Sequence, residues 1–437
     1  YATGALYELG KNNMISGKNE AALANFASVI NSSTANPYRK KALENSGLIY
    51  YNMNKNDQAL ASFKSVVSEY PNYQDSKTSL KQIELIYKTT GDIDSYESYL
   101  STLDFMDITD VALDSLSYSS AEDFYMDNSY EKAASLFQKY IQRFDHPIFA
   151  NNAHFYLAEC EYKTDNLEQA LANYSFNVNT QDPLFYNVSL ERSAELSYKL
   201  GDFKESLRYF QQLQSANLTI DEIAEIHWWT LKSASKIDSF NTVITEGNTL
   251  LNDSLPFAKR DAEIKYLMAT SYRAIGDSVN AMRFFREVSN STQEEKSAAS
   301  LYFIAEMLYE NHNLDSSEKV IFEVAQHTPT YSDWLAKALI LLSDIYVIQE
   351  DYFQARTTLE SIVGNYTGDP TILSSAKQKL KTLTELENNI FDNPKVTPIE
   401  EVDFNEDDAE NYNDDLFEEE ELEDETIPTP NKPKENE

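Results

Sequence analysis

The chain has 437 residues, a formal net charge of −36 and a single cysteine, Cys160. So strong a negative charge opposes general affinity for nucleic acid or anionic membranes, and one cysteine excludes an internal disulfide. No run of 18 apolar residues occurs, so the sequence predicts no membrane-spanning helix.

Small residues return about every 37 positions from the first tens of residues to about residue 355. They are Ala22, Ala59, Ala133, Ala170, Ser206, Ala281, Ser317 and Ala355. Another small residue precedes each of them by twelve positions: Gly10, Gly47, Ala121, Ala158, Ala194, Ala269, Ala305 and Ser343. A fixed period of this length predicts a repeat array, which is typical of a binding scaffold rather than of a catalyst.

The clearest unit, residues 40–71, predicts two antiparallel helices joined by a short turn. Apolar or small residues three to four apart mark one face of each helix, Leu43, Gly47 and Tyr50 in the first and Leu60, Phe63, Val66 and Val67 in the second. A polar break at 54–57 separates the helices, and Pro71 ends the second. We expect Gly47 and Ala59 at the closest crossing of the two helices. A single hairpin cannot bury its apolar stripe, so the units must stack.

We place ten such units near residues 4–36, 37–73, 74–110, 111–147, 148–183, 184–220, 221–255, 256–292, 293–330 and 331–370. Two depart from the pattern: Glu84 and Tyr96 hold the small positions of the third, and Leu231 and Val243 those of the seventh. The seventh also carries Trp228 and Trp229. These rings either fill a gap left by irregular stacking or form an aromatic contact site at a bend.

The C-terminal residues differ in composition from the repeats. Residues 371–391 predict one amphipathic helix that caps the array. From Asp392 to the end the chain has 19 acidic and 3 basic residues, hence a charge of −16. Such a segment buries too little apolar surface to order itself, so we predict a disordered acidic tail over 392–437.

The recurring order of small residue, aromatic residue four positions later and closing proline resembles the tetratricopeptide repeat, and the resemblance covers about residues 4–370. It implies an all-α superhelical solenoid that binds other proteins. The long joints, such as that around Pro71, look like those of bacterial cell-envelope proteins of this family, of the outer-membrane-assembly lipoprotein or Tol-Pal-associated type. We therefore expect a periplasmic or envelope location, with a cytoplasmic one as the alternative, and expect the chain to be part of a longer protein.

The resemblance also implies that the first helix of each unit lines the concave surface. Two positions on these helices are rich in aromatic residues. The first holds Tyr51, Tyr125, Tyr162, Tyr198 and Tyr309 in five units and Arg273 in a sixth. The second lies one turn earlier and holds Tyr118, Phe155, Tyr266 and Tyr302. We expect these ten residues to bind a polypeptide segment or partner domain; the alternative is that the rings complete the packing between helices. Acidic residues also recur there, at Glu44, Glu122, Glu159, Glu195, Glu306 and Asp344, either as a stripe that selects a basic partner or as a solvated face.

The sequence predicts no enzyme, no metal and no cofactor. The five histidines are dispersed over separate units, and no phosphate-binding or nucleophile motif appears. The sequence predicts a non-catalytic protein-interaction scaffold, and the resemblance of its joints adds the expectation that it acts in cell-envelope assembly. An alternative is the regulatory or substrate-positioning arm of a larger enzyme or signalling protein whose catalytic domain lies before residue 1.

Overall fold

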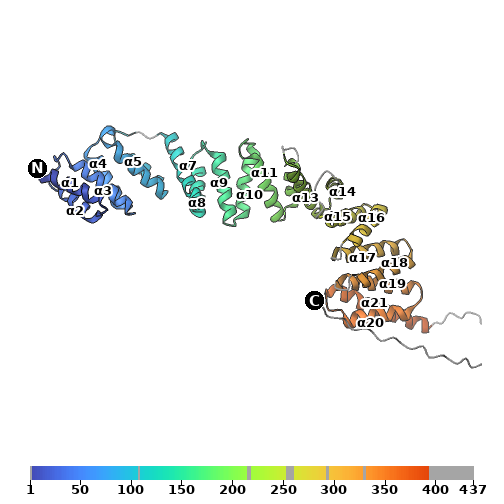
Figure 1. The fold of residues 1–437 in the computed structure, drawn as a ribbon. Helices are drawn as coiled ribbons and strands as arrows, with labels where there is room; N and C mark the ends of the chain where they lie inside the picture. Colours follow the sequence, from blue (N-terminus) through green and yellow to red (C-terminus); the bar gives the residue numbers. More distant parts are fainter. Residues whose placement is uncertain are drawn as a thin grey trace, which may run out of the picture.

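The computed structural model describes residues 2–106, 109–213, 218–251, 260–291, 295–327 and 331–392. In these ranges the chain forms 21 α-helices and no β-strand. Twenty of them pair in sequence order as ten hairpins, and α21 closes the row (Figure 1). The predicted all-α solenoid with a closing helix is confirmed. The predicted tail lies outside the described residues, apart from Asp392, which ends α21.

Each hairpin has a first helix with an odd number and a second helix with an even number. Their bounds are α1 Ala2–Ile15 and α2 Asn19–Ile30; α3 Arg39–Asn52 and α4 Asn56–Glu69; α5 Tyr73–Thr90 and α6 Ile93–Leu100; α7 Asp110–Met126 and α8 Tyr130–Arg143; α9 Ala150–Lys163 and α10 Leu167–Thr180; α11 Tyr186–Lys199 and α12 Phe203–Leu213; α13 Ile220–Lys236 and α14 Phe240–Leu250; α15 Asp261–Ala274 and α16 Ser278–Ser291; α17 Glu295–Glu310 and α18 Leu314–His327; α19 Ser332–Ile348 and α20 Tyr352–Asn365; and, last, α21 Pro370–Asp392.

The hairpin turns share one backbone feature: a residue with a left-handed φ follows the end of each first helix. These residues are Gly17, Asn54, Gly91, Asn128, Asp165, Gly201, Asp238, Gly276, His312 and Glu350. Glycine, asparagine and aspartate tolerate this conformation best, which explains why polar breaks and Gly-Asp pairs mark the turns in the sequence. The following amide donates back into the last turn of the helix, as Lys55 does to the carbonyl of Tyr50 at 2.9 Å.

The small residues lie where the two helices of a hairpin meet, and in the first two hairpins a glycine makes room for an aromatic ring. A Cβ atom added to Gly47 would lie 2.6 Å from the ring of Phe63, and one added to Gly10 would lie equally close to Phe26. Both rings are buried. Where serine takes the small position of the second helix it stays buried by donating to the first: the Ser206 hydroxyl bonds the carbonyl of Ala194 at 3.0 Å.

The two irregular units keep the hairpin form by other means. In the third hairpin, Tyr96 is buried and its hydroxyl donates to the carboxylate of Glu84 at 3.2 Å, so a polar pair replaces two small residues. Its second helix, α6, spans only eight residues. In the seventh hairpin, Leu231 and Val243 are both fully buried at the small positions.

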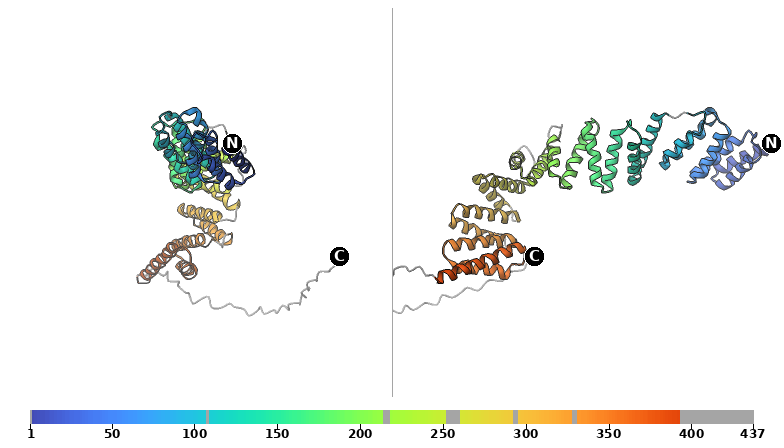
Figure 2. Two further views of the ribbon diagram at one scale, coloured as in Figure 1. Left: turned by 90° about the vertical axis from the view of Figure 1, so that its left-hand side faces the viewer. Right: turned by 180° about the vertical axis from the view of Figure 1, so that it is seen from behind.

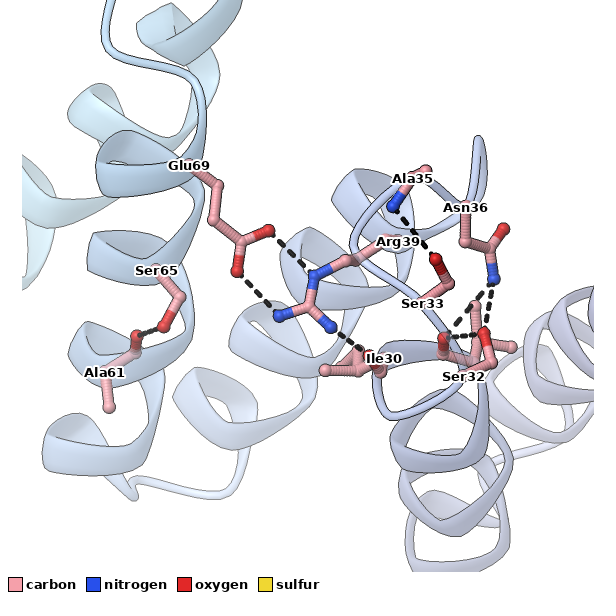
Figure 3. Close-up of polar contacts among 10 residues, drawn as sticks. Ile30, Ser32, Ser33, Ala35, Asn36, Arg39, Ala61, Ser65 and Glu69 are labelled. Atoms are coloured by element: carbon pink, nitrogen blue, oxygen red, sulfur yellow. Dashed lines mark hydrogen bonds and ion pairs between the residues drawn. The ribbon is translucent and has the colours of Figure 1, made fainter.

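Polar contacts also hold adjacent hairpins together, as the joint between the first two shows. The Arg39 guanidinium, at the start of α3, donates to both carboxylate oxygens of Glu69 at 2.8 and 2.7 Å and to the carbonyl of Ile30 (Figure 3). Glu69 ends α4 and Ile30 ends α2, so one side chain ties three helix ends together. Such a bidentate pair fixes geometry as well as adding energy.

The hairpins stack into an elongated row that turns once. The row runs in one direction from α1 to α14, bends near α15 and α16, and continues through α17 to α21 (Figures 1 and 2). At its end α21 packs on α19 and α20 and buries Ile372, Ala376 and Leu383, which shields the last hairpin as predicted for a capping helix.

Candidate partner-binding surface

At four joints of the row, the first helices of successive hairpins pack directly against one another. In the described part of the chain, five pairs of helices pack closely although they are not neighbours in sequence. They are α5–α7, α7–α9, α15–α17, α17–α19 and α19–α21. All of these are first helices or the closing helix. A row whose first helices approach one another curves toward them, so these helices form the inner face.

The first column of predicted site residues reaches forward to the next first helix. Four of its six side chains meet a partner about thirty residues later: the ring centroids of Tyr125 and Tyr156 are 4.8 Å apart, and those of Tyr198 and Trp229 are 5.0 Å apart. The same step brings Tyr162 within 5.3 Å of Arg192, and Arg273 to Phe303 and Glu306.

The second column behaves in the same way, one turn earlier. Tyr118 stacks on Phe149 with ring centroids 4.5 Å apart, Phe155 stacks on Phe185 at 4.6 Å, and Tyr302 packs on Trp334 at 5.6 Å. The exception is Tyr266, which contacts Phe285 within its own hairpin at 6.1 Å.

Taken together, the ten predicted residues lie at contacts between helices and keep part of their surface open. Tyr118 is buried; the others are half-buried, namely Tyr51, Tyr125, Phe155, Tyr162, Tyr198, Tyr266, Arg273, Tyr302 and Tyr309. Burial, and then the neighbouring Asp344, raise the pKa of the Tyr309 hydroxyl. These positions therefore serve packing between units, and their exposed edges remain available to a partner.

The recurring carboxylates are engaged in different ways. Glu122 accepts from the Tyr118 hydroxyl at 2.9 Å, and Glu306 accepts from Tyr302 at 2.8 Å. Asp344 accepts from the Lys379 ammonium at 2.7 Å. The remaining three differ in setting. Glu159 accepts from Tyr174, Glu44 is half-buried with its pKa raised by burial, and Glu195 is exposed beside Arg192.

Two hollows open between first helices. The first, the α7 hollow, has a volume of about 620 Å³ and is lined from α5, α7 and the start of α9 by residues that include Glu84, Tyr118, Ser119, Glu122 and Phe149. It contains the stacked pair Tyr118–Phe149 and two carboxylates. The predicted residue Tyr118 thus contributes to a recess on the inner face.

The second, the α11–α13 hollow, has a volume of about 460 Å³, within the range of natural ligand pockets. Apolar side chains line it from three helices and from a position two residues before α13: Val188, Phe210, Leu213, Leu218, Ile226 and Trp229. Carboxylates stand among them: Glu191, Glu195, Asp221, Glu222 and Glu225. Of the residues predicted from the sequence as a binding site or acidic stripe, only Glu195 belongs to this hollow.

The two adjacent tryptophans of α13 differ in setting: one fills the interior between helices, and the other lies at a surface recess. Trp228 is buried in the core that runs through α13, α15 and α17. Trp229 is half-buried, stacks with Phe210 at 6.4 Å and lines the hollow. One ring therefore fills the interior, and the other forms part of a recess.

Other kinds of site were also sought among the described residues. No group of three or more histidine, cysteine and acidic side chains there is arranged to hold a metal ion. Within the same residues, no helix has both the length and the apolar character needed to span a membrane. Cys160 is a free, buried thiol in α9.

Comparison with known families identifies one unit directly. Residues 41–73 match the tetratricopeptide repeat. This segment covers α3 and α4, the hairpin with Gly47 against Phe63, and it supports the tetratricopeptide repeat assignment made from the sequence. No curated protein matches.

Several solved structures match this chain at low sequence identity. The tetratricopeptide domain of P58(IPK) is 16% identical and covers 89% of this chain and 99% of its own, with a TM-score of 0.27. The C-terminal part of a repeat protein from Cytophaga hutchinsonii is 12% identical and covers 59% and 98%, with a TM-score of 0.42. Yeast Tom70 is 13% identical and covers 90% and 97%, with a TM-score of 0.35. None of these matches points to the cell-envelope type.

Proposed function

We propose that the protein is a non-catalytic scaffold that holds a partner polypeptide along the inner face of its first helices. The observation that carries this proposal is the pair of hollows on that face, each of which is lined by aromatic rings and by carboxylates of two successive first helices. Helical repeat arrays use such extended surfaces to bind other proteins.

The composition of the surface suits a polypeptide. Half-buried rings such as Tyr125, Tyr198 and Trp229 are already held by their neighbours, so a partner that packs on them costs little additional side-chain entropy. Carboxylates beside the rings provide hydrogen-bond acceptors for backbone amides and for basic side chains. Aromatic side chains are enriched at the centre of protein interfaces, and charged side chains around them help to select the partner.

The resemblance of the joints between units to those of bacterial envelope proteins supports a further proposal, that the partner acts in cell-envelope assembly and that the protein works in the periplasm or envelope. Fractionation of the source cells, with the natural full-length protein detected by antibody, tests this location. Recovery only with cytoplasmic proteins would contradict it.

Photo-crosslinking in the source cells tests the scaffold proposal. A photoreactive amino acid replaces Ser119 in α7 or Glu195 in α11, both of which line hollows on the inner face. The controls replace Val279 in α16 and Phe353 in α20, which are 80% and 74% exposed on second helices. We expect one or both inner probes to capture a discrete partner that neither outer probe captures. Equal capture from the outer probes, or none from the inner ones, would contradict the proposal.

A further inference from the structure

The α11–α13 hollow combines an apolar floor with an excess of negative charge. Phe210, Ile226 and Trp229 form its floor, and Val188 at its edge is 44% exposed. Five carboxylates line the same recess, and no lysine, arginine or histidine does. Apolar side chains and unneutralised carboxylates in one recess together restrict what can bind there.

The nearby cations neutralise only part of this charge. Arg192 pairs with Glu195 at 3.1 Å, and Arg260 pairs with Glu225 at 3.2 Å. Glu222 accepts from the backbone and side chain of Thr219 as a capping box at the start of α13. Glu191 and Asp221 have no ion-pair partner within the described part of the chain.

Two carboxylates in particular face the recess without a cation of their own. Desolvation, and then the like charge of Glu195, raise the pKa of Glu191; the nearby Arg192 offsets part of this rise, and Glu222 across the hollow adds to it. Each excess carboxylate is more stable beside a positive charge, and apolar contact area next to it favours a cation carried on an apolar segment.

We propose that the α11–α13 hollow binds a polypeptide segment that inserts an apolar side chain against Trp229 and places lysine or arginine residues on both sides of it. This rests on the proposed function and adds the chemistry of the partner. The apolar side chain covers the floor, and the flanking cations meet Glu191 on α11 and Asp221 on α13. The recess, at about 460 Å³, accommodates more than one large side chain.

Charge also indicates whether the bound segment belongs to this chain or to another polypeptide. The chain's own residues from Asp392 to the end carry 19 acidic and 3 basic side chains, so like charge disfavours them in this hollow. The occupant is therefore a different polypeptide, with a local excess of basic residues.

The test compares three synthetic peptides by calorimetric titration of the protein. One has a central Leu-Phe pair with two lysines on each side, one has the same centre with glutamates, and one has the lysines around a central Ser-Ala pair. We expect the first to bind at least tenfold more tightly than either of the others. Equal affinity for the two apolar peptides, or for the two basic ones, would overturn the proposal.

Reversal of charge in the hollow provides a second, independent readout. Glu191→Lys with Asp221→Lys should reverse the preference, so that the glutamate-flanked peptide binds at least tenfold more tightly than the lysine-flanked one. The matched control, Glu168→Lys with Asp315→Lys, changes two exposed carboxylates of α10 and α18 and leaves the net charge of the protein the same as in the test variant. An equal shift in this control would show that overall charge, and not the hollow, selects the peptide, which would overturn the proposal.

Trp229→Ala tests the apolar floor. It should weaken binding of the lysine-flanked Leu-Phe peptide at least tenfold, and hydrogen exchange of α13 reports whether this helix remains folded. Because the charge-reversal pair lies on exposed positions, it decides the question even if Trp229→Ala unfolds the hairpin. If the inner photo-crosslinks form but the peptides are not discriminated, this inference fails and the scaffold stands; if the inner crosslinks also fail, both fail.

Discussion

Replacement of Gly47 by alanine tests the packing rule of the regular hairpins, in which a small residue lies against a large buried side chain. The new Cβ would lie 2.6 Å from the ring of Phe63, which is only 1% exposed and cannot move into solvent. Overpacking of this kind costs about 1–3 kcal/mol, whereas the helix gains about 1 kcal/mol when alanine replaces glycine. We therefore expect a net loss of stability of up to about 2 kcal/mol.

Gly364 in α20 supplies the matched control, because an added Cβ there meets no atom within 4 Å. Gly364→Ala should show the helix gain alone, about 1 kcal/mol of stabilisation. The packing term is the difference between the two substitutions. In a Phe63→Leu background the cost of Gly47→Ala should fall, with a coupling of about 0.5–3 kcal/mol.

Hydrogen exchange of individual helices is the appropriate assay, because repeat arrays need not unfold as one cooperative unit. Gly47→Ala should accelerate exchange in α3 and α4, and Gly364→Ala should slow it in α20. If Gly47→Ala instead protects α3 as much as Gly364→Ala protects α20, the small positions are not set by the aromatic ring, and the explanation of the repeat is wrong.

Three further predictions concern single residues. The hydrogen bonds from Arg39 lower the pKa of Glu69 below its ordinary value of 4.5. The pair should therefore add about 1 kcal/mol of stability at neutral pH, and this should be lost as the pH falls from 4.5 through the lowered pKa. Glu69→Gln should remove this pH dependence from acid-unfolding curves of the first two hairpins. Glu350 has a φ of 59°, so Glu350→Gly should stabilise its hairpin by about 1 kcal/mol. This should appear as slower hydrogen exchange in α19 and α20, and faster exchange would refute it. Burial raises the pKa of Cys160 to about 12, so its thiol should react with a disulfide reagent only when α9 opens, and rapid labelling of the native protein would contradict the buried position.

Sequence alone was sufficient for the architecture because its constraint repeats. A ring at Phe63 requires a small residue at Gly47, and the same requirement returns in unit after unit, so many positions agree on one hairpin. The repeat pattern does not predict contacts that occur at a single site. Nothing in the pattern shows that Ser206 donates to Ala194, or that Tyr96 and Glu84 replace two small residues with a hydrogen bond, because each depends on one local contact.

The inner face was less predictable because it depends on the angle at which one hairpin packs on the next. Aromatic positions on the first helices were visible in the sequence, but their forward contacts, such as Tyr198 with Trp229, follow from the angle between units. That angle also forms the α11–α13 hollow, which brings Glu191 and Asp221 together from two hairpins. The irregular seventh unit and its paired tryptophans were the only signal in the sequence that this region differs.

The most direct test of the central claim is hydrogen exchange of the whole protein with and without the partner captured by the inner photo-crosslinks. The account predicts slower exchange in the first helices that line the hollows, chiefly α7, α11 and α13, and unchanged exchange in the second helices α8, α10 and α14. Protection confined to the second helices would contradict the claim that the inner face holds the partner.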